Sequence, residues 1–529
     1  MKFPFIKLSK IEKKFSYYEI KKELYKYDGS FIEISKNEKE VSIKVDIFSR
    51  VPFYYYVFKN QIYGNSSFLE LVKELKNKKL PISYDYVSIA AFLKNNCFLE
   101  NSTFFKEILR VPPGSKLIFN CQNGLINIDQ YYKYEKKNYK ETNENISAKY
   151  LEMLKQNFKN YIDDYKLEKI GISLTGGYDS RMILSVLDDI KIKPFAFHYG
   201  HKKSSDFKIS KRLCETYSLD SKINEWKNLN YFKSNYIKIL EESDFMLPLH
   251  HCHHHESILD QADYVDTVFY GHFMDMQMQS HFYNNNFDSV KSQTEIFKSL
   301  KNMWCGDPSA FSVLSMKMFK EFFSDEVIEG YNFKIDNMIN KYSYLDSDKQ
   351  YEISYLLNHG TRRAIKQCQL GSKKVDYYIP ALQKNVFELI WNLETRVKKN
   401  RKLQEFIYKN IYIKATKLDF VLDNYKVTNL NKSNFYRRNF EKIINILKNP
   451  KVKLLPSYFD FWGKEYHKFD NYKSWMSENI LMNESVLDKN LINDNIFYLI
   501  KNKQNDLPFA FISSLFTLVN FILFYKKLN

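Results

Sequence analysis

One stretch of the sequence combines residue types that could bind a phosphate: Thr175, Gly176, Gly177, Tyr178, Asp179 and Ser180. Two adjacent glycines allow positive φ angles and let an anion approach the main chain, because no Cβ atom stands in the way. Asp179 or Ser180 could cap a following helix, whose first N–H groups would then point at the occupant of the turn. We therefore expect this turn to bind phosphate groups. An ordinary glycine turn with a helix cap is the alternative.

Asp179 and Asp275 each lie just beyond the end of a predicted strand. Carboxylate oxygens are the ligands that Mg²⁺ prefers, together with phosphate oxygens and waters. The two aspartates therefore predict a magnesium site beside the phosphate-binding turn. Asp275 could instead be an ordinary turn residue.

The residues around the turn predict the elements that position it. A short apolar run before the turn is typical of a buried strand, and residues 181–187 have the apolar spacing of a helix. A second strand at 194–200 leads to a helix capped by Ser205 or Asp206, and a third strand follows at 265–270. Alternating strands and helices predict a parallel sheet with right-handed crossovers. Ligands of such sheets bind at the carboxyl ends of the strands.

The turn resembles the S-G-G-x-D-S loop of ATP pyrophosphatases, with Thr175 in place of the first serine. It lacks the spacing and the lysine of a Walker loop, and it is not a G-x-G-x-x-G motif. In the ATP pyrophosphatases this loop holds the β- and γ-phosphates of ATP, and its aspartate helps to hold magnesium. The resemblance implies ATP and Mg²⁺ as cofactors, with residues 175–177, Asp179 and Ser180 binding the nucleotide.

Further segments resemble asparagine synthetases. Asp275 occupies the aspartate position of their G-x-G-A-D-E motif, which implies that Asp179 and Asp275 are the catalytic, metal-binding pair. Residues 376–383 resemble E-x-R-x-P-F-L-D, but Gln383 replaces the final aspartate, which argues against aspartate as the substrate. Lys426 is similar in place to a pyrophosphate-binding lysine, although an ordinary surface lysine is the alternative.

Residues 1–140 are β-rich in pattern and resemble the amino-terminal glutaminase domain of asparagine synthetases. They contain D-x-x-x-R-x-P-x-Y-Y at 46–55 and R-V-P-P-G at 110–114. Glutaminases of that kind use an amino-terminal cysteine, exposed by removal of the initiator methionine, as the nucleophile. Here the second residue is Lys2, and no cysteine precedes Cys97. We therefore expect a retained domain without glutamine hydrolysis.

The predicted fold class is α/β plus α+β, in three parts. Residues 1–140 are expected to form a degenerate, β-rich Ntn-glutaminase-like domain. Residues 141–449 are expected to form an asparagine synthetase-like ATP-pyrophosphatase domain with a parallel sheet, similar to adenine nucleotide alpha hydrolases. Residues 450–529 are expected to form a helical C-terminal extension of that domain.

Composition limits the remaining function classes. Hydrophobic residues make up 44% of the 529 residues, with only 14 Gly and 12 Pro, which indicates a folded protein. The net charge is +18, but the lysines are scattered, so we expect no nucleic-acid partner. Six cysteines without a C-x-x-C pair favour a cytoplasmic protein. The apolar segment 507–524 is interrupted by polar residues, so we expect a buried terminal helix and no membrane span.

A histidine-rich tract at 250–255 invites a zinc assignment. Structural zinc usually needs ligands in separated pairs, and no second pair appears in the sequence. We therefore favour the rim of a substrate pocket, where protonated histidines would face an anionic substrate. A metal site is the alternative.

Together these features predict an asparagine synthetase-like, AMP-forming ligase that joins carbon to nitrogen. A substrate carboxylate would attack the α-phosphate of ATP to give an acyl-adenylate, and an amine or ammonia would then displace AMP. The expected partners are a small-molecule carboxylate and the nitrogen donor, with a homodimer or a pathway protein as further candidates. The alternative is a non-catalytic scaffold or binding relative, which the missing cysteine, Met276 and Gln383 support.

Overall fold

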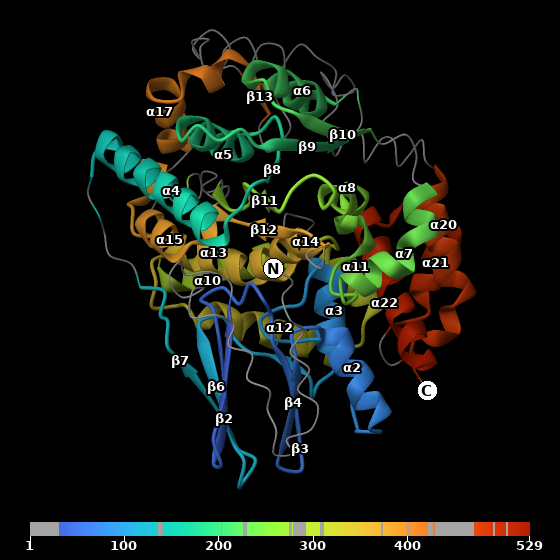
Figure 1. Cartoon of the computed structure of the whole chain (residues 1–529). Coiled ribbons are helices and arrows are strands. Elements are labelled where there is room, and N and C mark those ends of the chain that lie inside the picture. Colours follow the sequence, from blue (N-terminus) through green and yellow to red (C-terminus); the bar gives the residue numbers. More distant parts are fainter. Residues whose placement is uncertain are drawn as a thin grey trace.

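The computed structural model describes residues 31–528 with internal gaps (Figure 1). The gaps cover residues 136–138, 140, 201, 203, 226–229, 275–277, 279–291, 307–310, 372–373, 399–400, 422–426, 429–469, 490–491 and 504–505. Asp275 and Lys426, both expected at the site, therefore lie outside the described residues, as do Lys2 and Met276.

Five parallel strands form the sheet that carries the 175–180 turn. They are β8 (Ile170–Ser173), β9 (Phe195–Gly200), β10 (Ser221–Glu225), β11 (Thr267–Phe269) and β12 (Asp376–Tyr378). They lie in the order β10-β9-β8-β11-β12, and each neighbouring pair is parallel. The predicted parallel sheet is therefore confirmed. The first strand in sequence, β8, lies in the middle, with the next two strands on one side and the last two on the other.

Two helices follow the first strands of this sheet. α5 (Tyr178–Asp189) follows β8 and buries its apolar positions between 182 and 187, as the sequence spacing predicts. α6 (Ser205–Tyr217) follows β9, and the Ser204 hydroxyl accepts a backbone hydrogen bond of 3.1 Å from its first turn. The cap is therefore the residue before the predicted pair, and Asp206 has a different partner.

Antiparallel sheets dominate residues 31–130, in agreement with the β-rich pattern. One sheet has the order β1-β2-β6-β7 and another the order β4-β3-β5. The strands are β1 (Ile32–Lys36), β2 (Glu40–Val45), β3 (Tyr54–Phe58), β4 (Gln61–Asn65), β5 (Leu109–Arg110), β6 (Ser115–Asn120) and β7 (Ile126–Gln130). Two helices, α2 (Phe68–Asn77) and α3 (Tyr86–Asn95), lie between β4 and β5 in the sequence.

Helices separate the parallel sheet from the antiparallel sheets (Figure 1). They are α4 (Asn143–Tyr165), α10 (Gln293–Cys305), α12 (Asp325–Asn340), α13 (Ser347–Tyr355), α14 (Ile365–Gln369) and α15 (Lys384–Trp391). The helix predicted at 351–367 has a π-helix, η2 (Leu356–Ala364), between α13 and α14. This long helical segment contacts both sides, because Asn358 accepts a hydrogen bond of 2.7 Å from the N–H of Glu100 while Gly360 packs against Phe273.

The last described helices are α20 (Asp470–Met482), α21 (Asn495–Asn502) and α22 (Phe509–Lys527). By length and composition α22 could cross a membrane, but 67% of its most apolar window is buried inside the protein. Its Ser513 and Thr517 hydroxyls accept hydrogen bonds from the N–H groups of His250 and Leu249 at 3.0 and 3.1 Å. The polar residues that interrupt the apolar segment thus bind backbone groups inside the protein.

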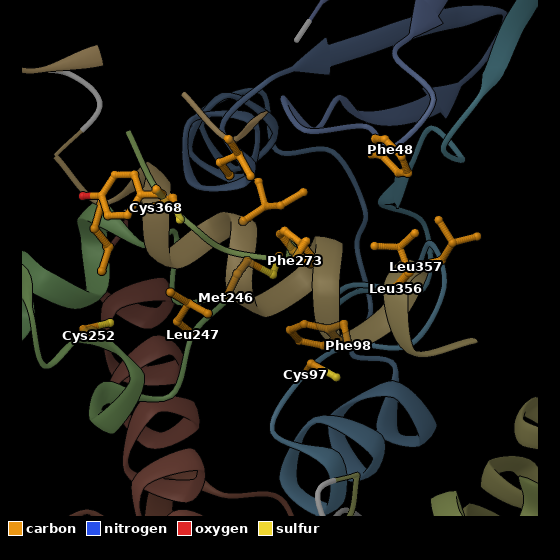
Figure 2. Packing of buried hydrophobic residues seen from close by; sticks show 14 of the residues in the cluster. Phe48, Cys97, Phe98, Met246, Leu247, Cys252, Phe273, Leu356, Leu357 and Cys368 are labelled. Carbon is orange, nitrogen blue, oxygen red and sulfur yellow. The ribbon is translucent and has the colours of Figure 1, made fainter. Parts of the chain in front are cut away.

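One large hydrophobic core runs through these parts. Figure 2 shows Phe98 from the N-terminal region, Phe273 from the chain after β11, and Leu356 and Leu357 from η2, which all belong to this core. A second, smaller core lies within the antiparallel strands and includes Ile43. The predicted division into three domains stays a prediction.

Candidate functional site

The 175–180 loop lies at the carboxyl end of β8, beside β11. Later strands join on both sides of β8, so the connections after β8 and β11 leave the sheet in opposite directions. A crevice forms at such a point, and it is the usual ligand site of open parallel sheets. The chain after β11 approaches closely: a Cβ atom on Gly271 would lie 2.7 Å from the carbonyl carbon of Asp179 and from the nitrogen of Ser180. Gly271 therefore has no room for a side chain.

Two hydroxyl groups fix the shape of the loop. The N–H of Thr175 donates to Ser180 Oγ at 3.0 Å, and Thr175 Oγ1 lies 2.9 Å from the same oxygen. Thr175 Oγ1 also accepts a hydrogen bond of 3.3 Å from the N–H of Gly177. Replacement of the first serine by threonine thus keeps the hydroxyl that closes the loop.

The start of α5 differs from the prediction in two ways. The N-cap is Gly177 and has no side-chain hydrogen bond, so neither Asp179 nor Ser180 caps the helix. Gly177 has φ −77°, and Gly176 is not among the described glycines with positive φ. The expected positive φ angles are therefore wrong. The glycines supply a helix start without a side-chain cap, and the first N–H groups of a helix have no intrahelical partner.

Asp206 binds the loop from α6. Its Oδ1 accepts a hydrogen bond of 2.6 Å from the N–H of Gly176. A carboxylate thus already accepts from one of the loop N–H groups, which leaves the first turn of α5 for an external anion. The prediction that Asp206 caps a helix missed this possible functional role. Ser204 and Asp206 also match an S-x-D pattern found at this place in asparagine synthetases.

His198 lies within β9, beside the residue that precedes the loop. Its Nδ1 is 2.8 Å from the carbonyl oxygen of Leu174, so Nδ1 carries the proton and donates. Burial lowers the pKa of His198 against the opposing effect of Asp206, and the ring is therefore neutral at pH 7. Its buried Nε2 has no hydrogen-bond partner among the described residues and could accept from a bound hydroxyl, amine or water.

Arg181 ties the loop to a segment more than 200 residues later. Its two terminal nitrogens donate to the carbonyl of Gly176 at 2.9 Å and to three carbonyls of the later segment, those of Ala415, Leu418 and Asp419, at 2.8–3.0 Å. The guanidinium carbon lies 3.7 Å from the ring centroid of Phe420. Burial lowers the pKa of Arg181 to about 10, which leaves it charged at pH 7.

Asp179 is half-buried at the mouth of the loop. Its Oδ1 accepts a hydrogen bond of 3.1 Å from Nε2 of Gln404, a buried residue of α17 (Lys402–Asn410). Tyr408, on the same helix, donates to the carbonyl of Tyr178 at 2.5 Å. The helix α17 therefore orients Asp179 from outside the loop.

The phosphate and metal hypotheses fit the described residues to different degrees. The start of α5, which no side chain caps, suits a phosphate, because the helix dipole and the first N–H groups of a helix favour an anion there. Five of the expected residues come together in this one loop: Thr175, Gly176, Gly177, Asp179 and Ser180. No group of three or more His, Cys, Asp or Glu side chains that could hold a metal occurs in the described part of the chain. The magnesium site therefore stays a prediction that depends on Asp275.

The histidine tract contradicts the expectation of a charged pocket rim. Burial is the main cause that lowers the pKa of His250 to about 3 and of His254 to about 4, and it holds the pKa values of His251 and His253 well below 6.5. These four rings are therefore neutral at pH 7. Their hydrogen bonds go mainly to backbone groups; His254 Nε2, for example, lies 3.0 Å from the carbonyl of Gln367. The tract is packed into the protein, with His254 buried and His250, His251 and His253 half-buried.

The matched residues of the N-terminal region form an internal network. Asp46 accepts hydrogen bonds from the N–H groups of Phe48 and Arg50, and it pairs with Arg50 Nε at 3.2 Å. Cys97 is fully buried, and burial raises the pKa of its thiol to about 12. A thiol in this state is not a nucleophile at pH 7.

Comparisons with known proteins give little beyond this geometry. No protein family matches the sequence, and no curated protein matches it. Among solved structures, the chain is similar to a glutamine-dependent NAD+ synthetase from Acinetobacter baumannii in complex with adenosine diphosphate. The likeness covers 64% of this chain and 77% of that chain, with 12% sequence identity and a TM-score of 0.19. A TM-score of this size does not establish a shared fold, so the function proposed below rests on the residues of the loop.

Proposed function

We propose that this protein is an ATP-dependent ligase that adenylates a substrate carboxylate and transfers the acyl group to an amine or ammonia. The observation that carries the proposal is the start of α5, which no side chain caps and which lies at the carboxyl end of β8, beside β11. Phosphate groups bind at helix starts in this position of parallel sheets.

Each residue of the loop has a role in this proposal. The first N–H groups of α5 would hold a phosphate, while Thr175 and Ser180 fix the turn and Arg181 holds it against the later segment. Asp179 and Asp275 would hold Mg²⁺, and Lys426 would approach the pyrophosphate. Bound Mg²⁺ would neutralise the charge that develops on the pyrophosphate as the α–β bond breaks.

The nitrogen donor is proposed to be an amine carried by a substrate. We propose that Cys97 does not release ammonia from glutamine, because it is buried and the pKa of its thiol is raised to about 12. An amine that is already bound gains up to about 10 kcal/mol from proximity in well-aligned cases, whereas free ammonia gains nothing of this kind. Incubation with glutamine should release no glutamate above background.

Release of pyrophosphate tests the ligase. Wild-type protein should release pyrophosphate from Mg-ATP with a suitable carboxylate, and Asp179→Asn should lower the rate by orders of magnitude with little loss of stability. Asp163→Asn, an exposed change on α4, is the matched control and should keep the wild-type rate. Equal rates in wild type and Asp179→Asn would refute the assignment. Ammonium and candidate amines, supplied separately, would then identify the nitrogen donor from the mass of the product.

A second candidate is a non-catalytic relative that keeps the fold as a scaffold. The hydrogen bond from Gly176 to Asp206 favours it, because that loop N–H already has an acceptor within the protein. A scaffold protein should bind no nucleotide, and Asp206→Asn should not change this result. In the ligase, by contrast, loss of the Asp206 charge changes the affinity of the loop for ATP.

A further inference from the structure

Three cationic side chains line one small cavity between the antiparallel strands and the helical segment 347–369. They are Arg110 at the end of β5, Arg362 on η2 and Lys366 on α14. The cavity also touches Phe98 and Met246, which Figure 2 shows beside this helical segment. The volume of the cavity is about 10 Å³, which is enough for one water or one ion of similar size.

The two arginines have no carboxylate partner within ion-pair distance in the described part of the chain. Arg110 is fully buried, and its bonds go to neutral groups: the Ser49 hydroxyl at 3.2 Å, the Thr361 hydroxyl at 3.3 Å and the carbonyls of Phe48 and Ser49. Arg362 is also buried; it donates to the carbonyl of Ser102 and lies 5.7 Å from the ring centroid of Phe98.

Asp46 acts electrostatically on Arg110 and Asp244 on Lys366, and both carboxylates are already paired. Asp244 pairs with Lys366 at 2.6 Å and also accepts from the Ser67 hydroxyl at 2.5 Å. Asp46 pairs with Arg50 at 3.2 Å. The groups that line the cavity, together with Asp244, therefore carry three positive charges and one negative charge, which leaves two positive charges without a counter-ion.

Such an arrangement is unfavourable without an anion. A buried charge without a partner costs several kcal/mol, and a guanidinium does not escape this cost by losing its proton. Burial and the nearby Arg362 lower the pKa of Arg110 to about 9, which still leaves it charged at pH 7. Arg362 and Lys366 are also four residues apart on one helical segment, a spacing at which like charges repel.

From the cavity and its charges we infer that Arg110, Arg362 and Lys366 form a binding site for a small monovalent anion of the size of chloride. The anion bridges β5 of the antiparallel strands to the helical segment 347–369 and stabilises their contact. A π-helix is rare and often marks a functional position, and η2 places both Thr361 and Arg362 at this cavity. Because the cavity has room for one particle of about the size of water, we expect a larger oxyanion such as sulfate to bind less well.

Thermal unfolding at constant ionic strength tests the site. Replacement of gluconate by chloride or bromide should raise the Tm of the wild-type protein by a few degrees and reach a plateau, whereas sulfate should not. Arg362→Met, which removes one charge, should lose most of this response. Lys414→Met removes an exposed ion pair with Asp188 and is the matched control, which should keep the full response. Equal halide responses in wild type and Arg362→Met would overturn the inference.

A second measurement does not depend on a variant that folds. Crystals of the wild-type protein grown in bromide should show an anomalous scattering peak within the cavity, close to Arg110 and Arg362. A cavity that holds only water in bromide would contradict the site, even if the Tm responds to halides. Neither experiment depends on nucleotide binding, so the anion site and the ligase assignment can fail separately.

Discussion

The loop after β8 and the histidine tract at 250–255 are both rich in polar side chains, but their polar atoms lie in different surroundings. In the loop, the hydroxyls of Thr175 and Ser180 hold the turn, and no side chain caps the start of α5 at the carboxyl end of β8. In the tract, His254 is buried and His250 is half-buried, and lowered pKa values keep both rings neutral at pH 7. The comparison shows that polar residues can form a binding site at the end of a strand. Where the fold surrounds them, polar residues instead pack against their neighbours.

Of the changes considered for the loop, removal of Arg181 should destabilise the protein most. Arg181→Met keeps much of the apolar stem but leaves four carbonyl oxygens without their donor, including that of Gly176. We expect a loss of about 3–5 kcal/mol in the free energy of unfolding, measured with urea. Arg212→Met, at an exposed position of α6, is the control and should change stability by less than about 0.5 kcal/mol. Similar losses in the two variants would show that Arg181 does not hold the loop.

Gly271→Ala should disturb the loop from the side of β11. The new Cβ atom would lie 2.7 Å from backbone atoms of Asp179 and Ser180, so one of the two segments must move. We expect about 1–3 kcal/mol of destabilisation from overpacking and a clear loss of nucleotide affinity. Urea unfolding and calorimetric titration with Mg-ATP would measure the two effects. If the folded variant bound Mg-ATP with unchanged affinity, the chain after β11 would have no part in the nucleotide site.

The stability of the protein in acid should show that the histidines of the tract are neutral in the folded state. The folded-state pKa values of His250 and His254 are lowered to about 3 and about 4, whereas unfolded histidine titrates near 6.5. The unfolded state therefore takes up protons first, so stability is complete above pH 6.5 and falls as the pH drops below it. Each such histidine contributes a slope of up to about 1.4 kcal/mol per pH unit.

Urea unfolding between pH 7 and 5 measures this slope. His254→Gln keeps a donor for the carbonyl of Gln367 but cannot titrate, so its slope should be smaller than that of the wild-type protein. A wild-type stability that does not change below pH 6.5 would mean that the tract is accessible to protons in the folded state, as a pocket rim would be.

The sequence predicts elements better than contacts. Apolar spacing located β8, α5 and β9 because each pattern is local, and the burial of α22 could be expected from its polar interruptions. The partners of the loop could not be predicted in this way, because Gln404 lies 225 residues from Asp179 and only the tertiary fold brings them together.

Local sequence patterns also did not predict the burial of the histidines or the backbone angles of the glycines. The protonated rim predicted for the tract failed because desolvation lowers histidine pKa values, and desolvation depends on what packs around the ring. The positive φ angles expected for the glycine pair failed because the turn needs space rather than an unusual conformation.

The smallest effect in this series concerns the hydroxyl that closes the loop. Thr175→Val keeps the shape but removes the hydrogen bonds to Ser180 and Gly177, which should cost about 1–2 kcal/mol in the free energy of unfolding. Thr175→Ser restores the hydroxyl and should stay close to the wild-type protein. If valine and serine behaved alike, the hydroxyl would have no part in holding the turn.

The most direct test of the central claim compares the same two regions by hydrogen–deuterium exchange with and without Mg-ATP. The amides of residues 178–181, at the start of α5, should exchange more slowly with nucleotide in the wild-type protein, because the phosphate accepts their hydrogen bonds. Peptides from 249–258 should be unaffected, and Asp179→Asn should lose most of the protection in the loop. Nucleotide that leaves 178–181 unprotected, or that protects the histidine tract instead, would contradict the account.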